Sequence, residues 1–153
     1  HIIMSEYVLR KLLVTDYHNN YLELLGQDFS INVSDISFDD FTDYIDTLPD
    51  TQQIIVLQHN SIDISGSYLI GSATIFIETK LIHNFGKVAH IEDVIIHNVF
   101  RGKGLGKLLL DKCIDIAKQE NCYKIILDCS DDNCRFYENC GFSKKGNQMA
   151  LYF

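Results

Sequence analysis

The pattern of apolar and polar positions along the chain first predicts its strands. Alternating runs and runs rich in β-branched residues are typical of strands. They occupy residues 7–11, 54–58, 69–78, 87–96, 124–129 and 148–152. A polar segment with Ser and Gly separates the second run from the third, which indicates an antiparallel hairpin.

Apolar residues spaced three or four positions apart predict four helices. The first follows Asp16, a potential N-cap, and the second ends before Pro49. The third covers residues 105–118 and the fourth residues 132–139, where Gly141 follows as a C-terminal stop. The predicted order is βααβββαβαβ, which indicates an α+β fold without repeats or linkers.

Composition limits the chain to one domain and disfavours some partners. With 153 residues, 46% hydrophobic and 22% charged, the chain can bury one core but not two. We expect this domain to cover residues 4–153, with residues 1–3 as a remnant outside it. The formal net charge of −8 argues against nucleic acid and anionic membranes as partners. No apolar run is long enough to span a bilayer, and we expect no signal peptide.

The cysteines bear on compartment and metal binding. There are five, an odd number, and none forms the C-x-x-C spacing of a zinc site. They are Cys113, Cys122, Cys129, Cys134 and Cys140. We therefore expect reduced thiols in a cytoplasmic protein and no bound metal.

A basic, glycine-rich turn, residues 100–108, lies between the predicted strand 87–96 and the helix that follows. Free N–H groups and the dipole at a helix start favour an anion, so the turn is a candidate phosphate cradle. A dinucleotide-binding G-x-G-x-x-G motif would need glycine at Lys107, and a P-loop would need it at Arg101. Both nucleotide motifs therefore fail.

The turn does fit the motif [Arg/Gln]-x-x-Gly-x-[Gly/Ala], with Arg101, Gly104 and Gly106. In this it resembles the pyrophosphate turn of the GNAT superfamily of N-acetyltransferases. Glycines would let the amides approach a diphosphate, and Arg101, Lys103 and Lys107 would supply positive charge.

The resemblance implies acetyl-CoA as co-substrate and the GNAT acyltransferase fold. That fold has a mixed, mostly antiparallel sheet, splayed at the acetyl-CoA site, with helices on both faces. The pantetheine would add to the sheet like a strand, and an N–H near Val94 would face the thioester oxygen. The implied cofactor-binding residues are Val94, Ile95, Ile96, Arg101, Gly102, Lys103, Gly104, Leu105, Gly106, Lys107, Asn133 and Tyr137.

A longer match is more specific. Residues 91–142 resemble, without gaps, the glucosamine 6-phosphate N-acetyltransferase family. The resemblance implies acetyl transfer from acetyl-CoA to the amine of D-glucosamine 6-phosphate, by direct attack in a ternary complex. The product, N-acetyl-D-glucosamine 6-phosphate, would serve UDP-N-acetylglucosamine biosynthesis. A homodimer that completes the sugar site is also implied.

Three side chains are the implied catalytic residues: Glu92, Asp128 and Tyr137. Carboxylates near an attacking amine can orient it and pass its proton to water, and a tyrosine hydroxyl can assist the departing sulfur. Each has a plainer interpretation: an ion pair or a turn cap for the carboxylates, and core packing for Tyr137. For Cys129 and Cys134 we favour packing over chemistry.

The implied sugar-phosphate residues are Lys80, Leu81, Ile82, His83, Glu92, Asp93, Tyr123, Lys124 and Asp128. Lys124 would meet the phosphate as a point charge. Two positions depart from the family: Gly26 stands where a small hydroxyl residue is expected, and the last strand has no arginine near Tyr152. Both departures concern the sugar phosphate and leave the cofactor site intact.

Two other functions fit parts of the sequence. A related acetyltransferase could act on another small amine, such as a polyamine, an aminoglycoside or a protein N-terminus; Lys124 would repel a polycation, whereas the net charge would attract one. A non-catalytic acyl-CoA-binding module would keep the cradle, but it would not need Glu92, Asp128 and Tyr137 together.

Overall fold

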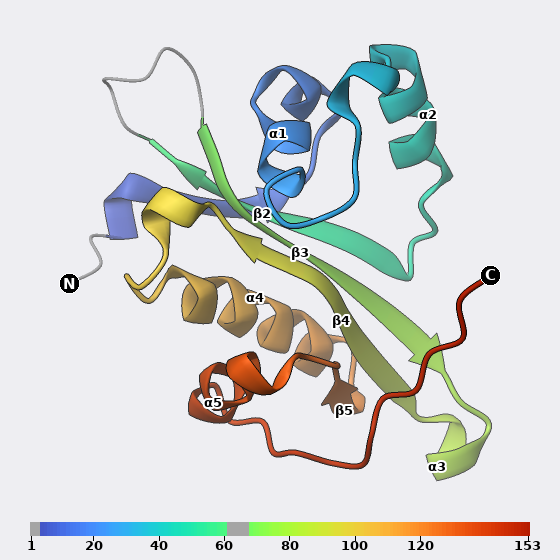
Figure 1. Ribbon diagram of the computed structural model, residues 1–153. Coiled ribbons are helices and arrows are strands. Elements are labelled where there is room, and N and C mark those ends of the chain that lie inside the picture. Colours follow the sequence, from blue (N-terminus) through green and yellow to red (C-terminus); the bar gives the residue numbers. More distant parts are fainter. Residues whose placement is uncertain (1–3, 61–67) are drawn as a thin grey trace.

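Figure 1 shows a computed structural model of the chain, which describes residues 4–60 and 68–153. Its centre is a five-stranded sheet in the order β1-β2-β3-β4-β5. The strands are β1 (Tyr7–Lys11), β2 (Gln52–His59), β3 (Tyr68–Thr79), β4 (Lys87–Ile96) and β5 (Cys122–Ile126). Neighbours are antiparallel except β4 and β5, which are parallel. The predicted mixed, mostly antiparallel sheet is confirmed.

Helices cover both faces of this sheet, as predicted (Figure 1). On one face lie α1 (Tyr21–Leu25) and α2 (Phe38–Thr47); on the other lie α4 (Leu105–Gln119) and α5 (Asp131–Asn139). The turn α3 (Ile82–Phe85) joins β3 to β4, and the short 3-10 helices are η1 (Met4–Glu6), η2 (Val14–His18), η3 (Val33–Asp35) and η4 (Asn98–Phe100). In the described part of the chain, no helix has the length and apolar character needed to cross a membrane.

The core forms where amphipathic helices meet the two faces of the sheet. Leu109, Leu110 and Cys113 of α4 are completely buried against Ala73 and Ile75 of β3. On the opposite face, the side chains of α1 and α2 pack over β2 and the start of β3. Burial of both faces holds the sheet rigidly in place, and the candidate site lies on this sheet.

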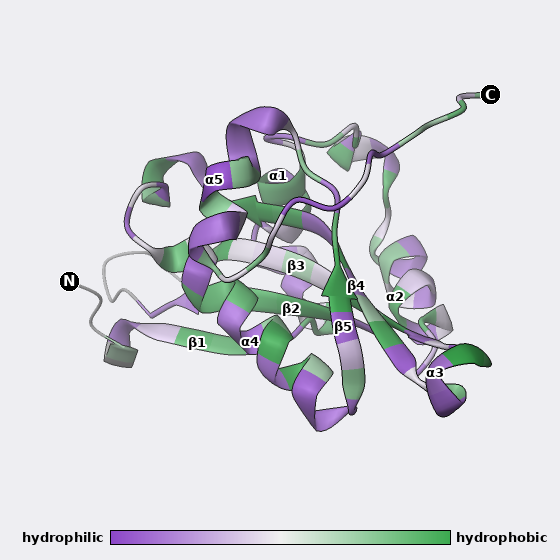
Figure 2. Ribbon diagram, turned by 90° about the horizontal axis from the view of Figure 1, so that it is seen from below, coloured by the Kyte–Doolittle hydropathy of each residue, from purple (hydrophilic) through white to green (hydrophobic). Residues whose placement is uncertain are grey.

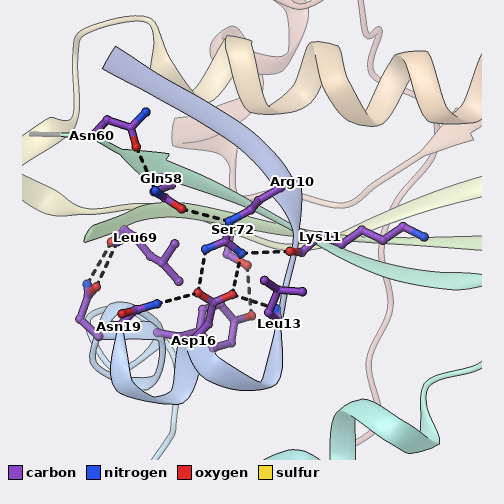
Figure 3. Close-up of polar contacts among 11 residues, drawn as sticks. Arg10, Lys11, Leu13, Asp16, Asn19, Gln58, Asn60, Leu69 and Ser72 are labelled. Atoms are coloured by element: carbon purple, nitrogen blue, oxygen red, sulfur yellow. Dashed lines mark hydrogen bonds and ion pairs between the residues drawn. The ribbon is translucent and has the colours of Figure 1, made fainter. Parts of the chain in front are cut away.

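A buried ion pair anchors the segment before α1 to the sheet (Figure 3). Asp16, expected as a helix cap, lies inside η2 with its side chain fully buried and accepts two hydrogen bonds from Arg10 of β1, at 2.7 and 2.8 Å. Its carboxylate also accepts from Leu13 N–H and from Asn19. Burial alone would raise the pKa of Asp16, but these hydrogen bonds outweigh it and the pKa is lowered.

The single helix predicted after Asp16 is in fact two, η2 and α1. Asn20 separates them in a left-handed conformation (φ 59°). Its side-chain amide donates to the carbonyl of Leu69 and accepts from the Leu69 N–H, both at 3.0 Å. Asn20 therefore extends β3 by imitating a strand partner and fixes α1 over the sheet.

The strand predicted at residues 148–152 is wrong. The chain after α5 has no helix or strand, and Met149 and Tyr152 are 93% and 91% exposed. Figure 2 shows this terminal segment leaving the body of the molecule. A strand needs a hydrogen-bonding partner, and none of the described strands supplies one here, although the sequence pattern suits a strand.

The other observed helix and strand boundaries lie closer to the predicted ones. The strand predicted at residues 124–129 is β5, which starts at Cys122 and leaves the sheet after Ile126. Gly141 closes α5 with φ 96°, as expected. Residues 1–3 and most of the polar segment between β2 and β3 lie outside the described residues.

Candidate active site

The sheet opens between β4 and β5. The two strands pair only from Lys87 to His90, while β4 continues to Ile96. From residue 91 onward the edge of β4 therefore has no β5 partner, and the expected splay is confirmed. An extended ligand with amide groups can pair with such an edge as an added strand.

A bulge in β4 accompanies this opening. Glu92 pairs with Thr74 and Ile95 with Ser72, so that two residues of β4, Asp93 and Val94, lie opposite one residue of β3. Asp93 has a left-handed backbone (φ 51°), which is uncommon for a residue other than glycine. Bulges of this kind redirect side chains next to active sites.

The glycine-rich turn has the geometry of an anion cradle. Gly102 and Gly104 have φ values of 76° and 80°, and Gly104 is the N-cap of α4 without a side-chain cap. The first hydrogen bond of the helix runs from Leu108 N–H to the Gly104 carbonyl, so the preceding amides have no partner within the helix. An anion at this terminus would be bound by those amides and by the dipole of α4.

The three cations of the turn already contact other residues. Arg101 donates to the Ile96 carbonyl (2.8 Å) and pairs with Asp28 (2.7 Å). Lys107 pairs with Asp111 at 2.8 Å, and the Lys103 ammonium lies 5.3 Å from the centre of the Phe100 ring. The lysines border the turn, whereas Arg101 ties the turn to β4 and to the segment after α1.

Two of the predicted cofactor residues, Ile95 and Leu105, can contribute only backbone atoms. Ile95 and Leu105 are 2% and 1% exposed, with their side chains in the core. Val94 and Ile96 pack against the cluster beneath α4. Asn133 lies in the first turn of α5, where its N–H donates to the Ser130 carbonyl; Ser130, not Asn133, is the N-cap.

The predicted carboxylates face different surroundings. Partial burial, followed by the Asp128 and Asp93 carboxylates, raises the pKa of Glu92, while His90 opposes the shift. Asp93 borders a cavity of about 490 Å³ beneath α1 and α2, and it also acts on the hydroxyl of Tyr44 there. Both Asp128 and Asp93 thus act on Glu92, and Asp93 also lines the cavity beneath α1 and α2.

Tyr137 lies on α5 in a second cavity, of about 330 Å³, which Asp128 also lines. Burial, followed by Cys129, Cys140 and Asp128, raises the pKa of Tyr137 to about 12. Its hydroxyl therefore keeps its proton at neutral pH. The plainer interpretation, core packing, also has support, because Tyr137 contacts the rings of Phe136 and Phe142.

The other predicted sugar-phosphate residues lie in the turn between β3 and β4 and at the start of β5. His83 stacks on Tyr123 with ring centres 4.2 Å apart, and the Lys124 ammonium lies 5.7 Å from the same ring. Lys80 instead pairs with Glu78 at 3.0 Å. Leu81 and Ile82 are exposed at the turn before β4. Across the described ranges 4–60 and 68–153, no cluster of three or more His, Cys, Asp or Glu side chains is arranged to hold a metal ion.

Comparison with known proteins places these features in a family. Residues 18–142 match the Acetyltransferase (GNAT) family. The chain is 40% identical over 146 residues to the glucosamine 6-phosphate N-acetyltransferase of Arabidopsis thaliana, covering 95% of each chain. It is 39% identical over 150 residues to that of Candida albicans, covering 96% of each. The chain belongs to the glucosamine 6-phosphate N-acetyltransferases of the GNAT family.

The fold agrees with this assignment to the GNAT family. A crystal structure of glucosamine-6-phosphate N-acetyltransferase from Arabidopsis thaliana matches with a TM-score of 0.88 and 37% identity, over 96% of this chain and 98% of that one. GNAT acetyltransferases use acetyl-CoA, and the cradle fits a diphosphate: it offers amides from two left-handed glycines and a helix start.

Sequence reasoning missed two residues at the acetyltransferase's cradle. Gln27 accepts a hydrogen bond from Asn98 N–H at 3.0 Å, and Asp28 pairs with Arg101. Both follow α1 and lie more than seventy positions before their partners. No local pattern indicates such pairs, which fasten the loop after α1 to η4 and to the glycine-rich turn.

Proposed function

We propose that this protein transfers the acetyl group of acetyl-CoA to the amine of D-glucosamine 6-phosphate, giving N-acetyl-D-glucosamine 6-phosphate and CoA. One observation carries the proposal: the unpaired half of β4 leads from Glu92, beside Asp128, to the cradle at Gly104. An extended thioester bound along this edge would have its diphosphate at the cradle and its acetyl group near the carboxylates.

Binding of acetyl-CoA would use mostly backbone groups. The amides at the start of α4 would bind the diphosphate, and the free edge of β4 would pair with the pantetheine amides. An N–H at the bulge, near Val94, would donate to the thioester oxygen as negative charge develops on it. Lys103 and Lys107 would add positive charge at the rim.

The amine would attack the acetyl carbonyl carbon directly, in a ternary complex. Its C–N bond forms as the C–S bond breaks, so no acyl-enzyme and no cysteine nucleophile are needed. Glu92 and Asp128 would orient the amine and pass its proton to water, a role that the raised pKa of Glu92 favours. Tyr137 would donate a hydrogen bond or its proton to the departing sulfur.

Recognition of the sugar phosphate would rest on Lys124 with Tyr123 and His83, which lie together. Lys80 would first have to leave Glu78. The exposed Tyr152 supplies no cation, and Gly26 supplies no hydroxyl. Lys124 is therefore our candidate for the main phosphate contact.

We also propose that the protein is a homodimer. Leu81, Ile82 and Phe85 are 79%, 62% and 71% exposed on the turn between β3 and β4, and the apolar terminal segment is exposed as well. A second copy would cover these residues and could complete the sugar site. The cytoplasm is the proposed compartment, which the five free cysteines support.

A panel of acceptors tests the reaction. Release of CoA thiol from acetyl-CoA is followed with glucosamine 6-phosphate, a polyamine, an aminoglycoside and a peptide with a free N-terminus. We expect the sugar phosphate to be the preferred acceptor. Preference for another amine would contradict the proposed acceptor, and tight acetyl-CoA binding without release for any amine would indicate a non-catalytic binding module.

A further inference from the structure

Two thiols meet at the junction between β5 and α5. The sulfur of Cys129, three residues past the end of β5, lies 3.8 Å from that of Cys134 in α5. Cys134 also points its thiol at the Ser130 carbonyl, 3.7 Å away. Both side chains are half-buried, whereas Cys113 is completely buried in the core. The pair is thus accessible and in van der Waals contact.

The local chain permits the two sulfurs to approach further. A disulfide requires a separation of about 2.0 Å, so the sulfurs must move together by roughly 1.8 Å. Cys129 lies in the irregular segment between Ile126 and Asp131, outside both strand and helix. Side-chain rotation and a small adjustment of this segment can supply the movement without breaking α5.

The position of the pair links it to the reaction. Cys129 and Cys134 line the 330 Å³ cavity that Asp128 and Tyr137 also line. Cys129 directly follows Asp128, and Cys134 precedes Tyr137 by three residues, about one helical turn. A bond between the sulfurs would therefore constrain the segment that carries Asp128 against the helix that carries Tyr137.

We propose that Cys129 and Cys134 form a redox modification site, which a peroxide converts to an intrachain disulfide that reversibly blocks acetyl transfer. One thiol loses its proton, and the thiolate attacks a peroxide oxygen; the O–O bond breaks, and the released hydroxide takes up that proton as water, leaving a sulfenic acid. The second sulfur attacks the sulfenic sulfur; the S–S bond forms, the S–O bond breaks, and the hydroxyl leaves with the second thiol's proton as a second water. Two thiols are oxidised while hydrogen peroxide is reduced to two waters, so the step balances.

The surroundings make the Cys129 thiolate scarce at neutral pH. Burial, followed by Cys134, Asp128 and Asp131, raises the pKa of Cys129. Lys144 lies near both thiols, but it pairs with Asp131 at 3.2 Å. At neutral pH Cys129 is therefore mainly in the thiol form, and its small thiolate fraction reacts slowly with weak oxidants. Once either sulfur is oxidised, the other is already in contact to complete the bond.

Trypsin offers a direct readout, because it cuts after Lys124 and Arg135. Peptide 125–135 then contains Cys129 and Cys134 and no other cysteine. The purified protein is treated with hydrogen peroxide, remaining thiols are blocked with N-ethylmaleimide, and the digest is analysed by mass spectrometry. We expect peptide 125–135 to be two hydrogen atoms lighter and unblocked. Cys134→Ser should prevent this change, whereas the matched control Cys122→Ser should not.

The same samples show whether the disulfide blocks acetyl transfer. This part of the proposal rests on the proposed function. Turnover of the oxidised protein should fall by up to about a hundredfold, because a displacement of roughly 1 Å at the reacting groups has an effect of this size. Reduction with dithiothreitol should restore turnover. Cys134→Ser should keep its own starting rate after peroxide. Blocked thiols in peptide 125–135, or a disulfide without loss of turnover, would overturn the proposal. The mass of the peptide reports the disulfide whether or not the protein is active. A protein that forms the disulfide but never transfers acetyl would therefore contradict the proposed function and not the oxidation of the thiols.

Discussion

The ring of Phe136 occupies the space that a side chain at Gly106 would need. A Cβ on Gly106 would lie 2.9 Å from Cζ of Phe136, closer than real contacts allow. Gly106 lies at the start of α4, in the glycine-rich turn, and Phe136 precedes Tyr137 on α5. The absence of a side chain at this proposed cofactor position therefore sets how closely the helix with the proposed acid packs against the turn.

This contact predicts the effect of Gly106→Ala. Overpacking of this kind costs about 1–3 kcal/mol, and here it would push α5 away from α4. We expect a higher KM for acetyl-CoA and a lower kcat. Phe136→Leu should relieve the clash, so the double variant should recover part of both. Strictly additive losses would show that the two residues act independently.

Replacing Tyr137 by Phe should slow turnover without abolishing it. General acid assistance is worth roughly 10²–10⁴-fold, and we expect the lower end or less, because a thiolate is a tolerable leaving group. The ring is retained, so the KM for acetyl-CoA should change little. The kcat defect should shrink with a thioester that has a better leaving group. An equal defect with both thioesters would make Tyr137 a positioning residue.

The pH profile should report on Glu92. A base works in its ionised form, and the pKa of Glu92 is raised, so the acidic limb of kcat/KM should lie at higher pH than for an ordinary glutamate. Asp128→Asn removes a negative neighbour and should shift the limb to lower pH, with burial keeping part of the shift. Asp115→Asn, on the exposed side of α4, is the control. An unmoved limb in Asp128→Asn would contradict the electrostatic pairing.

The Arg10–Asp16 pair should dominate stability near α1. Asp16→Asn leaves a largely buried guanidinium without its carboxylate, a change that costs about 3–5 kcal/mol. The pKa of Asp16 is lowered, so its contribution is present above the ordinary value of 3.8 and is lost as pH falls through the lower, folded-state pKa.

Urea unfolding measures this contribution. The difference between wild type and Asp16→Asn should be largest at neutral pH and should shrink in acid. Asp28→Asn breaks a half-exposed pair with Arg101 and should cost only about 0–1 kcal/mol. Equal losses in the two variants would contradict the importance of burial at Asp16.

Local sequence patterns predicted those elements of the fold whose signals lie within the element itself. The start of α4 was predicted correctly and its end to within one residue. Both signals, the periodic apolar positions and the preceding glycines, lie within the helix and its cap. The strand at residues 148–152 failed because pairing is not a local property. Asp16 is not the N-cap, although its carboxylate accepts from the N–H of the N-cap residue, Leu13; its main partner, Arg10, comes from a strand.

The site was only partly visible in the sequence. The motif residues identified the cradle, but the left-handed backbone of Asp93 and the pairing of Asp28 with Arg101 depend on how the sheet and the loop after α1 come together. The sequence indicated which groups are present, whereas the tertiary structure brings Asp128 near enough to raise the pKa of Glu92 and places Asp93 in the lining of the cavity beneath α1 and α2.

The dimer can be tested by removing residues 148–153. Sedimentation of the intact chain at micromolar concentration should give about twice the chain mass of 17.5 kDa. Deletion of the exposed terminal segment should weaken association, because apolar area is lost from the proposed interface. An intact chain that sediments as a fully active monomer at every dilution would refute the dimer.

The central claim is that the acceptor is glucosamine 6-phosphate, recognised through its phosphate. The direct measurement is kcat/KM for CoA release with glucosamine 6-phosphate and with unphosphorylated glucosamine, in wild type and in Lys124→Ala. We predict a strong preference for the phosphorylated sugar in wild type, and a loss in Lys124→Ala that falls on that sugar alone. Equal rates on the two sugars in the wild-type protein would contradict the account.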